Sequence, residues 1–137
     1  MNLVYPYTVE PQEGGGLFVQ FLDIEEAFTE GATLEEAAFN AAEVLSGILA
    51  YRLERGDALP APSLAPDAPC AAPSAEVQAA ILLRQARGER PLSELARALE
   101  TSWAAAQRLE DPHHWPTLKQ LDRAARVLGK RLVLSLE

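Results

Sequence analysis

The stretch Phe28-Thr29-Glu30-Gly31-Ala32-Thr33-Leu34-Glu35-Glu36 holds the end of a strand and the start of a helix. A strand around Phe28 and Thr29 is expected to stop at Gly31, a residue type that marks turns. Thr33 and Glu36 have capping-box spacing, in which the hydroxyl accepts from the N–H three residues on and the carboxylate bonds back. Gly56 is the residue type that commonly ends a helix. We therefore predict a short strand and then a long helix over residues 34–55. The apolar residues that follow one another at helical spacing in this helix are Leu34, Ala37, Ala41, Leu45, Ile48 and Leu49.

Two further strands are predicted before this stretch. Apolar residues alternate from Leu3 to Val9, and a second apolar run covers residues 17–22, with three consecutive glycines between the runs. This pattern is typical of an antiparallel hairpin. Pro6 favours an edge position for the first strand, because proline lacks the N–H that a central strand donates. Residues 1–56 should therefore form a three-stranded antiparallel sheet with one packed helix.

Residues 57–73 contain five of the ten prolines of the chain. Closely spaced prolines remove backbone donors and favour extended chain over helix. We interpret the segment as a linker with a short strand near Cys70. It separates a first domain, residues 1–56, from a second, residues 74–137.

The second domain has the pattern of an all-helical helix-turn-helix domain. A first helix is expected over residues 75–87, and a second begins with Pro91 as its first helical residue. A third helix is expected over residues 103–110 after a Ser102 cap, and a fourth from the Thr117 cap to Gly129. Leu118 is expected among the inward residues of the fourth helix. The small Ala96 allows two helices to cross closely. A terminal strand follows, whose apolar edge invites pairing with a second copy of the chain. The residues expected in this dimerisation strand are Leu132, Val133, Leu134 and Leu136. The fold class is thus α+β.

Charge is divided unevenly between the two parts. Residues 1–73 hold two Arg and no Lys against twelve Asp and Glu, a net charge of −10, whereas residues 74–137 have a net charge of +2. An acidic surface repels nucleic acid and attracts basic proteins, and a mildly basic one tolerates phosphates. The division predicts two different partners.

Several classes of protein are disfavoured by composition. The sequence has one cysteine, which excludes an intramolecular disulfide and a multi-cysteine zinc site. No apolar run reaches the roughly 20 residues that span a bilayer, and the N-terminus lacks a signal-peptide pattern. We expect a cytoplasmic protein without membrane contact, cofactor or metal.

The second domain offers a candidate DNA-reading helix. Gln107 and Arg108 are its best base readers, since glutamine can bind adenine and arginine can bind guanine through two bonds. Arg108 can alternatively pair with Glu110 or Asp111, and helical hairpins with this spacing also occur in proteins that bind no DNA. The adjacent His113 and His114 are poorly placed to share one metal ion. The residues predicted to contact DNA are Ser102, Trp103, Ala104, Gln107, Arg108, Thr117 and Lys119.

Metal-dependent nuclease activity would need several carboxylates that converge on one concave surface. Here Glu10 and Asp23 end different strands, and most other acids are predicted on an exposed helix face. We therefore predict no enzymatic activity. The carboxylates expected to bind a protein partner are Asp23, Glu25, Glu26 and Glu30.

The order of several motifs resembles the HicB antitoxin family over nearly the whole chain. The motifs are Tyr5-Pro6, Gly16-Leu17-Phe18-Val19, Phe21-Leu22-Asp23-Ile24-Glu25-Glu26-Ala27, Thr29-Glu30-Gly31, Thr33-Leu34-Glu35-Glu36-Ala37 and Pro60-Ala61-Pro62-Ser63. In the second domain, Glu94-Leu95-Ala96-Arg97, Asp111-Pro112-His113-His114 and Leu128-Gly129-Lys130-Arg131-Leu132 resemble the helix-turn-helix subclass of that family.

This resemblance implies a partial, catalytically inactive ribonuclease H-like first domain. That domain would bind HicA, a small basic toxin that cleaves RNA, and block its active site. The second domain would be a Cro/C1-like helix-turn-helix unit that forms a homodimer or larger oligomer and represses its own operon by binding operator DNA. Glu100 stands where helix-turn-helix units of the family usually place glycine.

Two other functions remain open from the sequence. The chain could be a stand-alone transcriptional regulator whose first domain senses a small ligand, and an active nuclease ranks last. A neighbouring short reading frame for a basic protein would separate the antitoxin from the ligand-responsive regulator.

Overall fold

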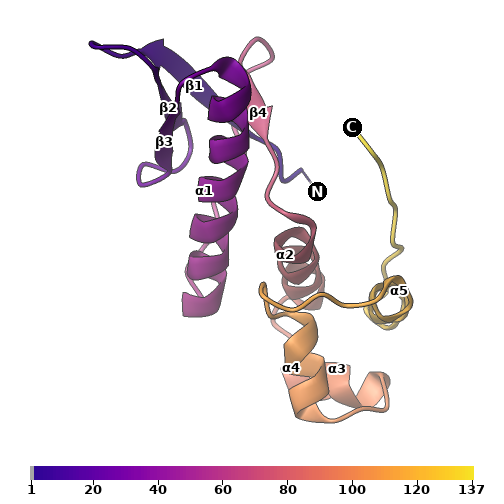
Figure 1. Cartoon of the computed structure of the whole chain (residues 1–137). Helices are drawn as coiled ribbons and strands as arrows, with labels where there is room; N and C mark the ends of the chain where they lie inside the picture. The colour runs from indigo at the N-terminus through magenta and orange to yellow at the C-terminus, as the bar shows by residue number, and fades with distance from the viewer. Residues whose placement is uncertain (1) are drawn as a thin grey trace. The chain divides into compact units, whose positions relative to one another are not determined.

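Four antiparallel strands form one small sheet in the first part of the chain. The computed structural model describes residues 2–137, as an α+β protein with this sheet and five helices. The strands are β1 (Tyr5–Pro11), β2 (Leu17–Phe21), β3 (Phe28–Gly31) and β4 (Cys70–Ala71), in the order β3-β2-β1-β4 (Figure 1). The predicted hairpin, the third strand and a short strand at Cys70 are thus confirmed.

β1 is a central strand, so the edge position predicted from Pro6 is wrong. β1 pairs with β2 on one side and with β4 on the other. Pro6 lies one residue beyond the Tyr7–Phe21 pair that ends the β1–β2 ladder. Its carbonyl still accepts from Leu22, at 3.2 Å. The missing N–H therefore removes only one terminal bond, which a central strand tolerates.

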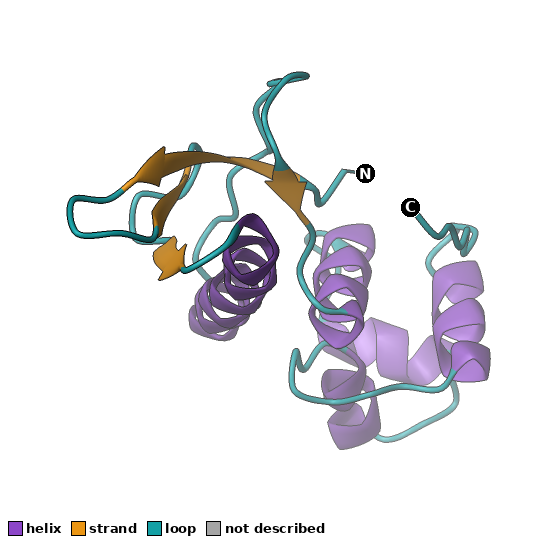
Figure 2. Cartoon of the chain, turned by 45° about the horizontal axis from the view of Figure 1, so that its top comes forward, coloured by secondary structure: helices purple, strands orange, loops and turns teal. Residues whose placement is uncertain are grey.

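The helix α1 (Leu34–Arg55) covers one face of the sheet (Figure 2). The Thr33 hydroxyl accepts from the N–H of Glu36 at 3.1 Å, and Gly56 ends the helix with a φ of 74°. Both helix ends therefore lie where they were predicted, but of the expected capping box only the bond to the Thr33 hydroxyl is present, without a return bond from the Glu36 carboxylate. Of the apolar residues at helical spacing, Ala37, Ala41, Leu45 and Leu49 are buried, whereas Leu34 is 69% exposed. As the first residue of the helix, Leu34 precedes the turn that packs on the sheet.

β3 and the first turn of α1 approach each other very closely at Gly31. A Cβ atom at this position would lie 2.5 Å from the backbone nitrogen of Ala37. No side chain fits there without movement of the backbone. Gly31 therefore permits the short connection that brings α1 onto the sheet.

Residues 57–73 are bonded to the sheet along their length. The hydroxyl of Tyr5 donates to the carbonyl of Pro60 at 2.7 Å, and the N–H of Tyr7 donates to the carbonyl of Pro69 at 2.9 Å. The backbone N–H of Ser63 donates to Asp23 at 2.8 Å, and the Ser63 hydroxyl donates to the same carboxylate. The first compact unit accordingly ends at Ser74, and the second begins at Ala75.

The second unit contains four helices: α2 (Ala75–Arg87), α3 (Leu92–Ala98), α4 (Trp103–Leu109) and α5 (Leu118–Val127). Ser102 caps α4, and Thr117 and Gln120 form a reciprocal capping box at α5. Pro91 is the cap of α3, one position earlier than predicted. The buried core residues are Leu83, Leu95, Ala96, Leu99, Ala106, Leu109, Ala124 and Leu128.

Two expectations for the second unit fail in this structure. Leu118 is exposed, because it is the first residue of α5 and precedes the turn that reaches the core. Residues 131–137 form neither helix nor strand, so the predicted strand is absent from the single chain. A strand needs a hydrogen-bonded neighbour, and this segment pairs with no strand of residues 2–137.

Candidate functional site

The acidic loop, residues 22–27 between β2 and β3, carries three of the four carboxylates predicted to bind a protein. Glu25 and Glu26 are exposed, and Asp23 is half-buried. The fourth, Glu30, is exposed in β3. The acidic loop and the neighbouring strand therefore bring these predicted residues into one region of the first unit.

The four carboxylates are not equally available to a partner. Asp23 accepts two bonds from Ser63, Glu26 forms an ion pair with Arg52, and Glu30 accepts from the amide of Gln12 at 3.2 Å. Of the four, Glu25 is the one whose carboxylate has no bonding partner within residues 2–137. Glu25 can therefore meet a cation without losing an internal contact.

The face of the sheet opposite α1 is not covered by a helix of the first unit. It carries an apolar strip, which we define as Phe18, Leu22 and Phe28. Leu22 and Phe28 are 47% and 53% exposed, and the rings of Phe18 and Phe28 lie 6.1 Å apart. Exposed apolar side chains that lie together are typical of protein-binding surfaces.

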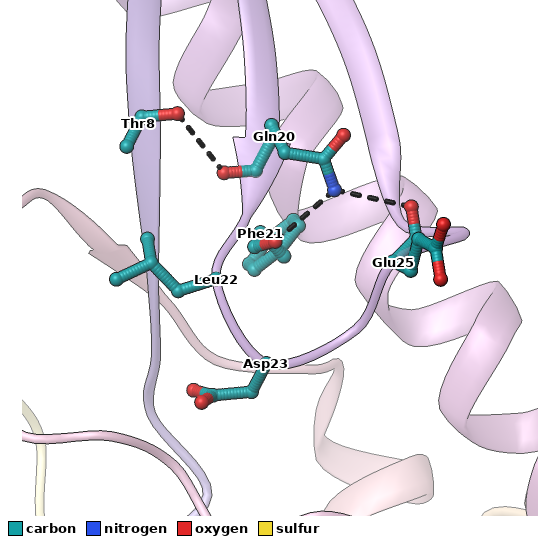
Figure 3. Close-up of a pocket in the computed structure, with 6 residues that line it drawn as sticks. All are labelled: Thr8, Gln20, Phe21, Leu22, Asp23 and Glu25. Atoms are coloured by element: carbon teal, nitrogen blue, oxygen red, sulfur yellow. Dashed lines mark hydrogen bonds between the residues drawn. The ribbon is translucent and has the colours of Figure 1, made fainter.

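A shallow hollow of about 430 Å³ lies beside the apolar strip (Figure 3). Its lining residues are Thr8, Gln20, Phe21, Leu22, Asp23 and Glu25. The hollow thus joins the uncovered face of the sheet to the acidic loop. Apolar and acidic side chains are available there to one partner.

The side chain of Gln20 is the feature of this region that the sequence analysis missed. Its Nε2 atom lies 3.1 Å from the carbonyl oxygens of Phe21 and Glu25, and 3.3 Å from those of Ile24 and Ala27. The only sequence signal is an amide in the middle of an otherwise apolar strand. That signal does not tell which backbone groups the amide meets.

In the second unit, the predicted DNA-contacting residues of α4 share an exposed surface. Ser102, Trp103, Ala104, Gln107 and Arg108 are all exposed, while Ala106 and Leu109 face the core. Thr117 and Lys119 are exposed at the start of α5. The hydroxyls of Ser102 and Thr117 accept bonds from their own helices. Each hydroxyl keeps its hydrogen available to donate, for example to a phosphate.

The alternative partners of Arg108 are occupied by other groups. Glu110 accepts two bonds from Arg87, at 2.6 and 2.9 Å, and Asp111 accepts from the backbone of His113. The bond to Glu110 raises the pKa of Arg87, and burial acts in the opposite direction. Within residues 2–137 Arg108 forms no ion pair, so its guanidinium can contact an outside group.

The residues predicted for dimerisation lie in the last segment of the chain. Val133, Leu134 and Leu136 are exposed, and Leu132 is half-buried. The single chain therefore leaves most of this apolar segment in contact with solvent.

No three or more His, Cys, Asp and Glu side chains in residues 2–137 are grouped so that they could hold a metal ion. Over the same residues, no helix combines the length and apolar character needed to cross a membrane.

Comparisons with known proteins identify the family of the chain. The family described as "HicB_like antitoxin of bacterial toxin-antitoxin system" matches residues 4–71. "Antitoxin HicB 1" of Photorhabdus laumondii is 32% identical to the chain, over 99% of the chain and 88% of the relative. "Antitoxin HicB" of Escherichia coli K12 is 32% identical, over 95% of the chain and 96% of the relative. Because the similarity spans nearly the full length of both, the chain belongs to the HicB antitoxin family.

Proposed function

We propose that this chain neutralises a small, basic, HicA-like RNA-cleaving toxin by binding it directly. The observation that carries the proposal is the uncovered apolar strip beside the acidic loop in a unit of net charge −10. Apolar contacts supply binding free energy, and surrounding acids favour a basic partner and speed its approach. The names of the relatives support the same role.

The first unit is proposed to act without catalysis, as a partial ribonuclease H-like fold. The carboxylate of Asp23 accepts hydrogen bonds from Ser63, and the carboxylate of Glu26 forms an ion pair with Arg52. Carboxylates bound to their own fold are poorly suited to hold the metal ions of a nuclease. The antitoxin therefore blocks the toxin by covering it.

The experiment is co-expression with the basic protein encoded beside the gene, followed by a pull-down through the antitoxin. Residues 1–74 are used as well as the full chain, because residues 57–73 are bonded to the sheet. We expect both to capture the toxin and restore growth, with an association rate that falls as salt rises. Capture by residues 75–137 alone, or a rate indifferent to salt, would contradict the proposal.

We also propose that the second unit represses its own operon as a homodimer or a larger oligomer. α3 and α4 would form the helix-turn-helix, with Gln107 and Arg108 as base readers and Thr117 and Lys119 at phosphates. Because the net charge of this region is only +2, two copies would be needed for useful affinity.

Gel shifts with the upstream DNA test this role. Replacing Gln107 should cost about 1–3 kcal/mol and relax sequence preference, whereas replacing Lys119 should weaken all sequences alike. Sedimentation of a chain that ends at Lys130 tests Leu132, Val133, Leu134 and Leu136 as the dimer contact. A dimer that persists without these residues would place the contact elsewhere.

A ligand-responsive regulator is the second candidate, and the hollow lined by Thr8 and Gln20 is the observation that favours it. The two candidates differ in the co-expression experiment. A regulator would bind the upstream DNA but would leave the neighbouring basic protein uncaptured.

A further inference from the structure

One amide nitrogen lies among the backbone carbonyls of the acidic loop. The Nε2 atom of Gln20 lies within 3.3 Å of four backbone carbonyl oxygens, from Phe21, Ile24, Glu25 and Ala27. Figure 3 shows the bonds to Phe21 and Glu25. The loop is therefore curled around this side chain, with its carbonyls directed inward.

Four carbonyl oxygens that point at one place repel one another unless a positive group lies between them. The amide supplies two hydrogens and their partial positive charge, so it suits this position. A carboxylate of the same size would put negative charge among four acceptors, which is strongly unfavourable. The site therefore distinguishes glutamine from glutamate on electrostatic grounds alone.

The loop does not depend on Gln20 for its basic course. The N–H of Ala27 donates to Ile24 at 3.1 Å, and the N–H of Phe21 donates to Ala27 at 3.0 Å. Within residues 2–137, the bond from Gln20 is the only one to the Glu25 carbonyl. Its contribution is thus to hold the part of the loop where Glu25 lies, and Glu25 is the acid with no internal partner.

We propose that Gln20 is a positioning residue for toxin binding, which fixes the acidic loop so that Glu25 points toward the partner beside the apolar strip. This inference rests on the proposed antitoxin function. Gln20 itself lies opposite Thr8 and Phe28 in the sheet, so it is anchored in the strands on both sides. A rigid loop binds more tightly, because its ordering cost is met before the partner arrives.

The test uses the full-length chain with Gln20→Met and Gln20→Glu, and a catalytically inactive form of the neighbouring basic toxin. Loss of one or two hydrogen bonds in Gln20→Met should weaken toxin binding about tenfold. Gln20→Glu should weaken it more, although it adds negative charge to a surface that meets a basic partner. Leu64→Glu is the charge control, because Leu64 is 97% exposed in the first unit and lies outside both the hollow and the group of carbonyls around Gln20. It adds the same charge and should bind at least as tightly as the unaltered chain.

A pH series separates positioning from general damage to the fold. The introduced carboxyl of Gln20→Glu can donate a bond once it is protonated, so this variant should regain affinity as pH falls. The unaltered chain should lose affinity over the same change, because its exposed acids become neutral. Tighter binding by Gln20→Glu than by the unaltered chain, or no regain at low pH, would overturn the inference.

Amide hydrogen exchange at Phe21 and Ala27 follows the loop without any toxin. We expect faster exchange in Gln20→Glu and normal exchange in Leu64→Glu. Unchanged exchange in Gln20→Glu would overturn the anchoring. Faster exchange with unchanged toxin affinity would overturn the positioning role while leaving the antitoxin function intact. Failure of the proposed function itself would appear differently, as no toxin binding by the unaltered chain.

Discussion

Each unit has a backbone position that is unfavourable for most residues, and the two units place different residue types there. In the first unit, the close approach of β3 and α1 is made by Gly31, where a Cβ would lie 2.5 Å from backbone. In the second unit, the turn between α3 and α4 is made by Glu100 at a φ of 54°, the one non-glycine residue of positive φ in residues 2–137. The first unit is thus fitted closely at this point, while the second retains strain before its proposed reading helix.

The turn at Glu100 is nevertheless well bonded. The N–H of Glu100 donates to Arg97 at 3.1 Å, and the N–H of Thr101 donates to Ala96 at 3.0 Å. This pair of bonds is the Schellman arrangement, in which glycine normally supplies the left-handed residue. Hydrogen bonds can thus hold a residue of unfavourable φ in place, as at Glu100, whereas they cannot offset a steric clash with backbone such as a side chain at Gly31 would make.

The largest expected effect is at Gly31. Gly31→Ala should lower the free energy of unfolding of the first unit by about 3 kcal/mol, because the new methyl group meets backbone that cannot move aside. Urea denaturation measures the change. Gly47→Ala is the control, since open space surrounds that position in α1, and it should stabilise the helix by about 1 kcal/mol. Similar midpoints for the two variants would contradict the close fit.

The second unit has its own demanding contact, the ion pair of Arg87 and Glu110, whose side chains are only 13% and 9% exposed. Arg87→Met should destabilise this unit by about 2–3 kcal/mol, because it leaves a poorly solvated carboxylate without its partner. Adding Glu110→Leu should recover much of the loss, since no charge then remains unpaired. Equal unfolding midpoints for the single and double variants would refute this account.

Glu100→Gly tests the retained strain directly. It should stabilise the second unit by about 1 kcal/mol, because glycine adopts the left-handed region without steric cost. Glu100→Ala removes the charge but keeps the Cβ, so it should leave thermal stability nearly unchanged. If both variants stabilise the unit equally, the charge and not the backbone is the source of the cost.

The smallest effect concerns pH and the first unit. Burial raises the pKa of Tyr5 above 10.0, Asp23 raises it further, and Arg52 acts in the opposite direction. A raised pKa in the folded state means that stability is fully present below pH 10 and is lost as pH rises through the folded value. Tyr5→Phe should cost about 1 kcal/mol at neutral pH, through loss of the Pro60 bond, and should flatten this alkaline decline. Part of the decline should remain, because burial also raises the pKa of Tyr7.

Local patterns predicted the helices and strands well, because their signals lie within a few residues. Thr33 with Glu36, Ser102 and Gly56 each mark a helix end by chemistry that acts over one turn, and the structure confirms all three ends. The family was likewise accessible from ordered motifs, and the comparisons confirm it.

Contacts between distant residues were not predictable in this way. The central place of β1 depends on pairing with Cys70–Ala71, and the pairing of Arg87 with Glu110 depends on how α2 meets the end of α4. For the same reason, the group of backbone carbonyls around Gln20 could not be predicted from the sequence. Local chemistry specifies each of these residues only after the fold has brought its partners together.

The bonds from β1 to residues 60–71 also set an order of events during synthesis. Tyr5 and Tyr7 reach their last partners only when Pro60, Pro69 and Ala71 have been made. Every strand and helix of the first unit is then already present, while α2 to α5 are still to be translated. At about 5–20 residues per second, the rest of the chain needs several more seconds. Each new molecule therefore contains every residue of its proposed toxin-binding unit before the unit proposed to bind DNA has been made.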